Sequence, residues 1–250
     1  MPPSPTKQRL DRLLVERGLA ESGARAQALI LAGRVFRGEQ RLDKPGMLLA
    51  ADAPLSVRPT EEYVGRGAHK LIAGLERFAI VPAGLVCLDV GASTGGFTDV
   101  LLRRGAARVY AVDVGYGQLD ARLRADPRVV VLERTNARYL STSEVPEPID
   151  LVVCDASFIG LRTVLPAPLA LTRPGAWVIA LIKPQFEVGR ERVGKGGVVR
   201  DAALHEAVCH AIAGWLGGLP GWRVLGVAAS PLRGPAGNRE FLIGAVRDTE

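Results

Sequence analysis

Apolar runs and helical patterns alternate along most of the chain. Runs of strand length lie near residues 85–90, 107–112, 128–132, 149–154 and 176–182, and two more near 222–229 and 240–247. Apolar residues at helical spacing predict helices near residues 67–78, 95–104, 118–124, 157–171 and 201–217. This alternation predicts a parallel, doubly wound sheet, and the turn 231–237, rich in Pro and Gly, predicts an antiparallel edge made by the last two strands.

The N-terminal part of the chain follows a different pattern. Leu10, Leu13 and Leu14 share one helical face that ends near Gly18, and Ser22 is a candidate N-cap for a second helix. Short strand-like pieces follow near residues 34–36 and 55–57, whereas residues 1–8 show no periodicity and are expected to be disordered. The predicted organisation is a small α+β domain (1–58), a polar linker (59–66) and an α/β domain (67–250).

Charge and cysteine usage narrow the class of protein. The chain has 250 residues and a net charge of +6, and residues 1–44 hold nine Lys or Arg against five Asp or Glu. Such a surplus is consistent with a nucleic-acid partner. The three cysteines and the His205–His210 spacing form no metal-site pattern, so no metal is expected. Without a signal peptide or an apolar run of about 20 residues, the sequence predicts a cytoplasmic protein with no membrane partner.

A glycine-rich loop after the first strand of the larger domain is the most informative motif. Glycines allow a ligand to approach the backbone closely, and the following helix offers free N–H groups. The loop is not G-x-G-x-x-G and has no basic residue for a pyrophosphate, which favours S-adenosylmethionine over NAD. The expected cofactor contacts are Asp89, Gly91, Ala92, Ser93, Thr94, Gly95, Gly96 and Phe97.

A second acidic residue supports this interpretation. Asp113 ends the next strand, roughly 20 residues after the loop, where a carboxylate can accept hydrogen bonds from ribose hydroxyls. A carboxylate that only caps the end of the strand is the alternative.

Two more charged residues follow apolar strands at the same sheet edge. Asp155 ends the fourth strand and Lys183 the fifth, so both are expected to face the cofactor crevice. A lysine whose stem lies along the strand end is the alternative for Lys183. No prolines follow Asp155, as enzymes that methylate exocyclic amines typically have, and Cys154 precedes the acid, so it is a poor candidate for the nucleophile of cytosine C5 chemistry. Both observations argue against methylation of a base.

The small domain resembles the S4-like (α-L) RNA-binding domain. The matching residues are Arg9-Leu10-Asp11, Leu14-Val15-Glu16-Arg17-Gly18-Leu19, Ser22, Ala26, Leu29-Ile30 and Gly33-Arg34-Val35. The resemblance implies contacts between basic side chains and the phosphates of structured RNA, and the candidates are Arg9, Arg12, Arg25, Arg34 and, beyond the domain, Arg66. Gly23 stands where the family usually has arginine, and Arg25 is the candidate to replace it.

The larger domain resembles the FtsJ-like ribose 2′-O-methyltransferases. Lys70, Asp155, Lys183 and Glu240 occur in the chain order of that family's Lys-Asp-Lys-Glu tetrad. The chain is also similar to the TlyA (hemolysin A) family nearly from end to end. The segments that carry this similarity are Gly65-Arg66-Gly67-Ala68-His69-Lys70, Asp113-Val114-Gly115-Tyr116-Gly117, Glu133-Arg134-Thr135-Asn136-Ala137-Arg138, Lys183-Pro184-Gln185-Phe186-Glu187 and Ser230-Pro231-Leu232.

This resemblance implies a Rossmann-like class I methyltransferase sheet that uses S-adenosylmethionine to methylate the ribose 2′-hydroxyl of a cytidine in ribosomal RNA. It also places Asn136 near the adenine, although an asparagine in an ordinary turn is an equal alternative. Short extensions at both ends favour the large-subunit RNA alone, with both subunits as the other possibility. The oligomeric state cannot be read from the sequence.

The tetrad's residue types fit ribose methylation. The hydroxyl must lose its proton as it attacks the sulfonium methyl, and a lysine can accept that proton only if its pKa is lowered. We expect Lys183 to be the base or the electrostatic activator, Asp155 to orient it, and Lys70 and Glu240 to position the ribose. The glycine-rich segment 187–200, with Arg190, Arg192 and Lys195, is either a lid that contacts RNA or a flexible loop.

Two other functions stay open at this point. One is an RNA-binding ribosome-assembly factor with weak or no catalysis, which would carry the same basic domain. The other is a membrane-active hemolysin, as the family's older name indicates. The complete tetrad argues against the first, and the lack of a membrane segment argues against the second.

Overall fold

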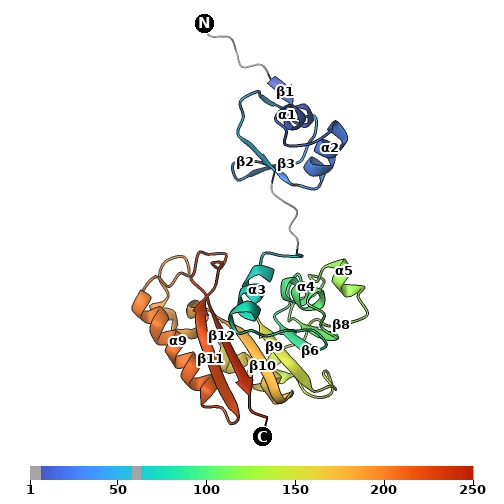
Figure 1. Cartoon of the computed structure of the whole chain (residues 1–250). Helices are drawn as coiled ribbons and strands as arrows, with labels where there is room; N and C mark the ends of the chain where they lie inside the picture. The colour runs from blue at the N-terminus through green and yellow to red at the C-terminus, as the bar shows by residue number, and fades with distance from the viewer. Residues whose placement is uncertain (1–6, 58–62, 250) are drawn as a thin grey trace. The chain divides into compact units, whose positions relative to one another are not determined.

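The computed structural model describes residues 7–57 and 63–249, and the chain divides into two compact units, Met1–Glu62 and Tyr63–Glu250 (Figure 1). Residues 1–6 of the segment predicted to be disordered lie outside the described residues. Its last two residues do not fit that prediction, because Lys7–Arg9 form strand β1, which pairs antiparallel with β4 (Leu48–Ala50). Of the predicted linker 59–66, residues 59–62 also lie outside the described residues.

The smaller unit packs two helices and a three-stranded sheet around one core. Helix α1 (Leu10–Glu16) buries Leu10, Leu13 and Leu14, and α2 (Gly23–Leu31) starts where the Ser22 side chain accepts a hydrogen bond from the Arg25 N–H. The strands β2 (Val35–Arg37), β3 (Gln40–Leu42) and β5 (Leu55–Val57) form an antiparallel sheet in the order β3-β2-β5. The helices agree with the predicted ones, whereas three-residue strands such as β3 are too short for periodicity to reveal.

A seven-stranded sheet organises the larger unit, in the order β11-β12-β10-β9-β6-β7-β8. Its strands are β6 (Val86–Val90), β7 (Arg108–Val112), β8 (Val129–Leu132), β9 (Ile149–Cys154), β10 (Thr172–Ile182), β11 (Trp222–Ala229) and β12 (Phe241–Arg247). The first five run parallel, and β12 is antiparallel to both β10 and β11. The predicted antiparallel edge is confirmed, and the last strand lies inside it.

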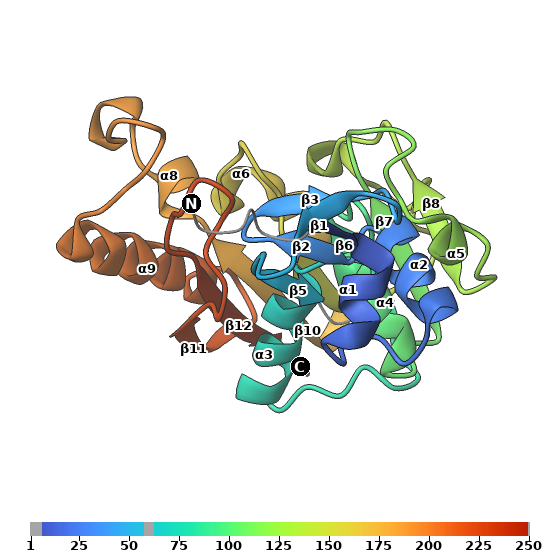
Figure 2. The same cartoon turned by 90° about the horizontal axis from the view of Figure 1, so that it is seen from above.

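Helices cover both faces of this sheet. Residues of α3 (Ala68–Arg77), α4 (Gly96–Arg103) and α5 (Ala121–Arg124) pack into one core, and residues of α6 (Leu161–Val164), α7 (Pro166–Ala170) and α9 (Ala202–Gly217) pack into the other. Neighbours along β6 alternate between the two cores, as a strand buried on both faces requires. Figure 2 shows α9 near β11 at one end of the sheet and α5 beside β8 at the other.

Two predicted helices are shorter than expected. The helix expected over 157–171 is two short helices, α6 and α7, after a loop that covers residues 155–160. Pro166 separates them, because proline supplies no N–H and clashes with the preceding turn. The helix expected over 118–124 is reduced to α5. Its N-cap is Asp120, whose carboxylate accepts a hydrogen bond from the Arg122 N–H at 2.9 Å. The loop at 155–160 matters most, because it lies directly after a tetrad residue.

Candidate active site

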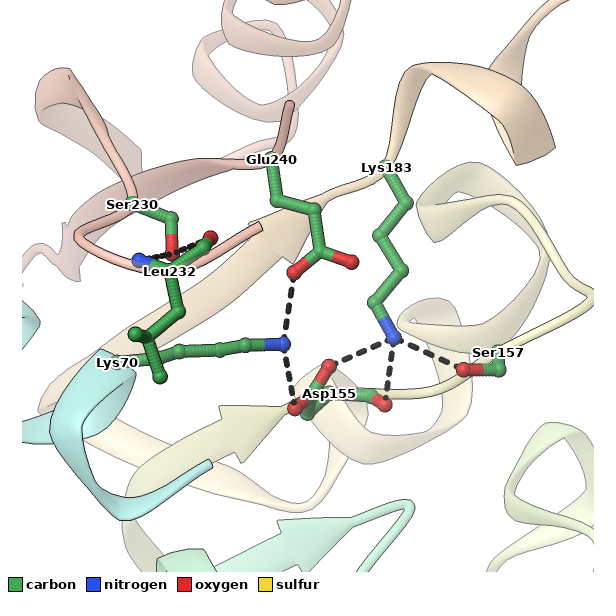
Figure 3. Close-up of polar contacts among 7 residues, drawn as sticks. All are labelled: Lys70, Asp155, Ser157, Lys183, Ser230, Leu232 and Glu240. Atoms are coloured by element: carbon green, nitrogen blue, oxygen red, sulfur yellow. Dashed lines mark hydrogen bonds and ion pairs between the residues drawn. The ribbon is translucent and has the colours of Figure 1, made fainter. Parts of the chain in front are cut away.

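The four tetrad residues meet at one edge of the sheet (Figure 3). Asp155 follows the end of β9 and Lys183 the end of β10, and these strands are parallel, so both residues lie at their carboxyl ends. Strand β12 runs the opposite way, which places Glu240, just before its start, at the same edge. Lys70 comes from the first turn of α3, which covers this part of the sheet. The topology therefore gathers residues that are far apart in the sequence.

Asp155 lies between the two lysines. The Lys70 Nζ lies 2.7 Å from Glu240 Oε2 and 3.4 Å from Asp155 Oδ2. The Lys183 Nζ lies 2.6 Å from Asp155 Oδ1 and donates hydrogen bonds to the Asp155 backbone oxygen at 3.0 Å and to Ser157 Oγ at 2.9 Å. Each ammonium group thus faces a different oxygen of one carboxylate, as Figure 3 shows.

Three of the four tetrad residues are buried, the Asp155 side chain is 19% exposed, and the tetrad is balanced in charge. Relative exposure is 8% for Lys70, 6% for Lys183 and 3% for Glu240. Two ammonium groups and two carboxylates sum to zero, which lets the cluster persist in a site where an unpaired charge would be costly. A lysine whose stem merely lies along the strand end would keep its ammonium group in water. The Lys183 ammonium instead turns inward, so that alternative is wrong.

A cavity of about 590 Å³ lies between the tetrad and the glycine-rich loop. All four tetrad residues line it, together with six of the predicted cofactor contacts, Gly91, Ala92, Ser93, Thr94, Gly96 and Phe97. Four predicted contacts are not among its lining residues, and these are Asp89, Gly95, Asp113 and Asn136. The cavity therefore joins the tetrad to the loop expected to hold the methyl donor.

The glycine-rich loop approaches neighbouring backbone too closely for side chains. Gly91 has φ +85°, and a Cβ there would lie 2.9 Å from the Cα of Ala156. Gly95 has φ +100°, and a Cβ there would overlap the Leu123 side chain. Ser93 also adopts a positive φ of 51°, which a non-glycine residue rarely does. These constraints shape a cradle with exposed backbone beside the cavity, and such a cradle fits the amino-acid end of S-adenosylmethionine.

Asp113 holds this loop in place. Its Oδ2 accepts a hydrogen bond from the Ser93 N–H at 2.8 Å, and its Oδ1 accepts one from the Gly115 N–H at 2.7 Å. Each carboxylate oxygen has a second lone pair, so two acceptor positions stay available for the hydroxyls of a ribose. Asp113 is only half-buried, so a ligand can reach it.

Asp89 lies beneath the loop and not in the cavity. It is fully buried, its Oδ2 accepts a hydrogen bond from Thr98 Oγ1 at 2.7 Å, and its Oδ1 has no partner among the described residues. Burial raises the pKa of this carboxyl to about 7. The residue thus links β6 to α4 behind the cradle.

Asn136 and the predicted RNA contacts differ in how far their side chains are already engaged. The exposed Asn136 accepts a hydrogen bond from the Arg138 N–H at 3.1 Å, which leaves its amide N–H groups for a ligand.

Among the predicted RNA contacts, Arg9 is paired with Asp11 at 2.7 Å. Arg12 and Arg25 are exposed, Arg34 is half-buried, and Arg66 is exposed at the rim of the cavity.

Ser157 and Phe158 are among the cavity residues that the sequence analysis missed. Ser157 binds Lys183, and Phe158 is 90% exposed with φ +66°. The Phe158 ring lies 5.3 Å from that of Phe186, centroid to centroid. Their position directly after Asp155 was the available signal, but the predicted helix over 157–171 obscured it. A strained, exposed phenylalanine in such a place is typical of a binding surface.

The sheet order, the cradle and the buried lysine–carboxylate cluster define a Rossmann-like methyltransferase with an additional N-terminal domain. The chain belongs to the FtsJ-like methyltransferase family, whose model matches residues 63–247, and an S4 domain model matches residues 8–53. Among the described residues, no helix is long and apolar enough to cross a membrane, and no group of three His, Cys, Asp or Glu residues is placed to hold a metal ion.

Several relatives are similar to this chain along nearly its whole length. The chain is 52% identical to the 16S/23S rRNA (cytidine-2′-O)-methyltransferase TlyA of Mycobacterium tuberculosis, over 95% of this chain and 89% of that protein. It is 32% identical to the 23S rRNA (cytidine-2′-O)-methyltransferase TlyA of Campylobacter jejuni, over 92% and 94%. The solved structure of a candidate hemolysin from Streptococcus thermophilus matches with a TM-score of 0.74 and 38% identity, over 98% and 90% of the two chains.

Proposed function

We propose that this protein transfers a methyl group from S-adenosylmethionine to the ribose 2′-hydroxyl of a cytidine in ribosomal RNA. The observation that carries the proposal is the buried cluster in which Lys70 and Lys183 face opposite oxygens of Asp155, at one side of a cavity whose other side is the glycine-rich cradle. A ribose hydroxyl at this cluster would lie between fixed cations and a methyl donor held in the cradle. Such placement supplies much of the rate of a transfer reaction.

Lys183 has the central role in this proposal. Its ammonium group is bound by three oxygen atoms, two from Asp155 and one from Ser157, so the charge stands at a fixed place. A preorganised cation stabilises the negative charge that develops on the 2′-oxygen as its proton leaves. Asp155 orients this lysine, and the Lys70–Glu240 pair positions the ribose. The variant Lys183→Arg distinguishes a lysine that acts as the base from one that acts as the electrostatic activator. A guanidinium keeps its proton, so it can only activate the hydroxyl.

The cofactor would be held by the cradle and by Asp113. The residues from Gly91 to Thr94, with Gly96 and Phe97, would enclose the methionine end, and Asp113 would accept hydrogen bonds from the ribose hydroxyls. Asn136, whose amide N–H groups are available, is proposed to face the adenine. The bound S-adenosylmethionine supplies the electrophilic methyl group.

The RNA would be held by both units. The S4 domain is proposed to bind phosphates through exposed arginines such as Arg12 and Arg25. Phe158, at the rim of the cavity, offers an open ring face, and unstacked RNA bases commonly stack on such faces. Arg66, also at the rim, is proposed to contact a phosphate of the RNA.

The large-subunit RNA is the proposed substrate, and the cytoplasm the proposed location. The names of both TlyA relatives above include 23S rRNA, whereas 16S rRNA occurs only in the name of the one from Mycobacterium tuberculosis. The test is methyl transfer from labelled S-adenosylmethionine to purified 50S and 30S subunits from a strain that lacks the enzyme. We expect alkali-resistant 2′-O-methylcytidine in 50S RNA. Cofactor binding without transfer to either subunit would favour a ribosome-assembly factor instead.

A further inference from the structure

The cavity has a wall that neither the tetrad nor the cradle provides. The segment 194–198 folds back on itself as a small hairpin, with a bridge between Gly194 and Val198. Gly196 and Gly197, at its turn, line the cavity, and Lys195 beside them is exposed. This hairpin lies within the segment 187–200, for which the sequence left a lid and a flexible loop as alternatives.

One side chain joins this hairpin to the loop that leads to Glu240. The Oδ1 of Asn238 accepts a hydrogen bond from the Val199 N–H at 2.9 Å, and its Nδ2 donates one to the Gly197 backbone oxygen at 2.8 Å. The side-chain amide thus binds the backbone on both sides of Val198, the residue that pairs with Gly194. Asn238 is only 3% exposed, so water competes little for these bonds.

The asparagine is itself held firmly. Its backbone oxygen accepts a hydrogen bond from the Gly234 N–H at 3.0 Å, and two residues further along, the Glu240 backbone oxygen accepts one from the Ser230 N–H at 2.9 Å. On the hairpin side, the His205 ring Nε2 lies 3.0 Å from the Val199 backbone oxygen. The hairpin is therefore tied to α9 on one side and to the Glu240 loop on the other.

We propose that Asn238 is a positioning residue for methyl transfer. Its amide fixes the hairpin 194–198 relative to Glu240, so that the two present one continuous wall to the target nucleotide. The hairpin then forms a wall of the site that Asn238 keeps in place, with the cationic Lys195 at its edge. This inference rests on the proposed function and adds a cavity-lining residue that belongs to neither the tetrad nor the cofactor cradle.

The test compares Asn238→Ala with Thr172→Ala in the full-length protein. Thr172 is a matched control because its buried hydroxyl donates to the Leu169 backbone oxygen at 2.6 Å, at the start of β10 and so at the end of that strand opposite Lys183. We expect the alanine variant at 238 to lower the single-turnover rate on ribosomal RNA at least tenfold and to leave the S-adenosylmethionine Kd within twofold. The control is expected to keep the parent rate within threefold.

Amide hydrogen exchange measures the hydrogen bond between Asn238 and Val199 independently of activity. In Asn238→Ala the Val199 amide is expected to exchange at least tenfold faster, while the Ile243 amide in β12 stays unchanged. Val199 exchange equal to the parent's, or rates equal to those of the Thr172 control, would overturn the proposal. If Asn238→Ala does not fold, Asn238→Asp keeps the acceptor for Val199 and loses the bond to the Gly197 backbone oxygen, so it is compared with the Thr172 control by its single-turnover rate.

The outcomes also separate this proposal from the function on which it rests. Absence of transfer by the parent protein would overturn the proposed function and this inference with it. Transfer by the parent, together with equal rates in the two variants, would overturn the role of Asn238 alone.

Discussion

The ammonium group of Lys183 lies 2.6 Å from Oδ1 of Asp155 and 3.0 Å from the backbone oxygen of the same residue. One residue thus anchors Lys183 twice, through its carboxylate and through its main chain. Because the backbone position is set by β9, the lysine is fixed relative to the whole parallel sheet. The second carboxylate oxygen of Asp155 faces Lys70, which couples the two cations through one side chain.

Removing that carboxylate is expected to affect stability and activity together. Asp155→Asn leaves Lys70 paired with Glu240, and it leaves the buried Lys183 without an acidic partner among the described residues. Loss of one member of a buried pair typically costs about 3–5 kcal/mol. We expect a clear loss in the free energy of unfolding, measured by urea denaturation, and a strong loss of methyl transfer. Asp126→Asn, which removes a partly exposed surface pair with Arg128, is the control and is expected to cost less than about 1 kcal/mol.

Asp89 predicts a specific dependence of stability on pH. Its pKa is raised to about 7 in the folded protein by burial, so the folded state binds a proton that the unfolded state has already released. The stabilisation is complete below the ordinary carboxyl range and is lost as the pH rises through 7. Asp89→Asn should remove this dependence. Urea denaturation between pH 4 and pH 8 should therefore show the parent losing stability relative to the variant, and parallel curves would contradict the account.

The close approach at Gly91 predicts loss of cofactor binding on a minimal change. Gly91→Ala adds a methyl group 2.9 Å from the Cα of Ala156, at a φ that disfavours side chains. The backbone must shift, and we expect the S-adenosylmethionine Kd, measured by calorimetry, to rise at least tenfold. Gly84→Ala is the control, because Gly84 has a similar φ of +76° and open space around it. Equal affinities in the two variants would show that the cradle does not hold the cofactor.

The exposed arginines of the S4 domain predict salt-sensitive RNA binding. Each of Arg12→Glu and Arg25→Glu should weaken binding to ribosomal RNA, measured by filter retention, and should make the slope of log affinity against log salt shallower by about one unit per lost phosphate contact. Arg9→Glu should have a different effect, since it also removes the ion pair with Asp11 and lowers stability. Unchanged affinity in both the Arg12 and the Arg25 variants would place the RNA elsewhere.

Long, periodic elements were predictable from the sequence, and so was the meeting of Asp155 and Lys183 at one sheet edge. The apolar runs that end at Asp155 and Lys183 fix those residues at one sheet edge, because parallel strands share the direction of their carboxyl ends. Glu240 could be placed there only through the resemblance, since its position depends on the insertion of β12 between β10 and β11. That insertion is a long-range pairing on which local patterns carry no information.

The remaining differences between the predicted and the observed structure arise where a single residue overrides the apolar pattern. Pro166 divides an apolar stretch of helical spacing. The positive φ of Phe158 is incompatible with a helix there, so the first helix of this region begins only at Leu161. The hydrogen bonds from the Asn238 side chain to the hairpin could not be predicted, because the sequence around one asparagine in a turn does not indicate which backbone groups it binds. Sequence patterns describe elements well, whereas side chains that join two loops emerge only from the folded chain.

The central claim, that the buried cluster around Asp155 carries out ribose methylation, is tested most directly at Lys183. The measurement is the single-turnover rate of 2′-O-methylcytidine formation on ribosomal subunits by the parent and by Lys183→Met, with S-adenosylmethionine affinity and Tm measured on both. The account predicts a rate loss of roughly 100-fold or more, as for removal of a general base or a preorganised charge, with cofactor affinity retained. A variant that folds, binds the cofactor and methylates at close to the parent rate would contradict it.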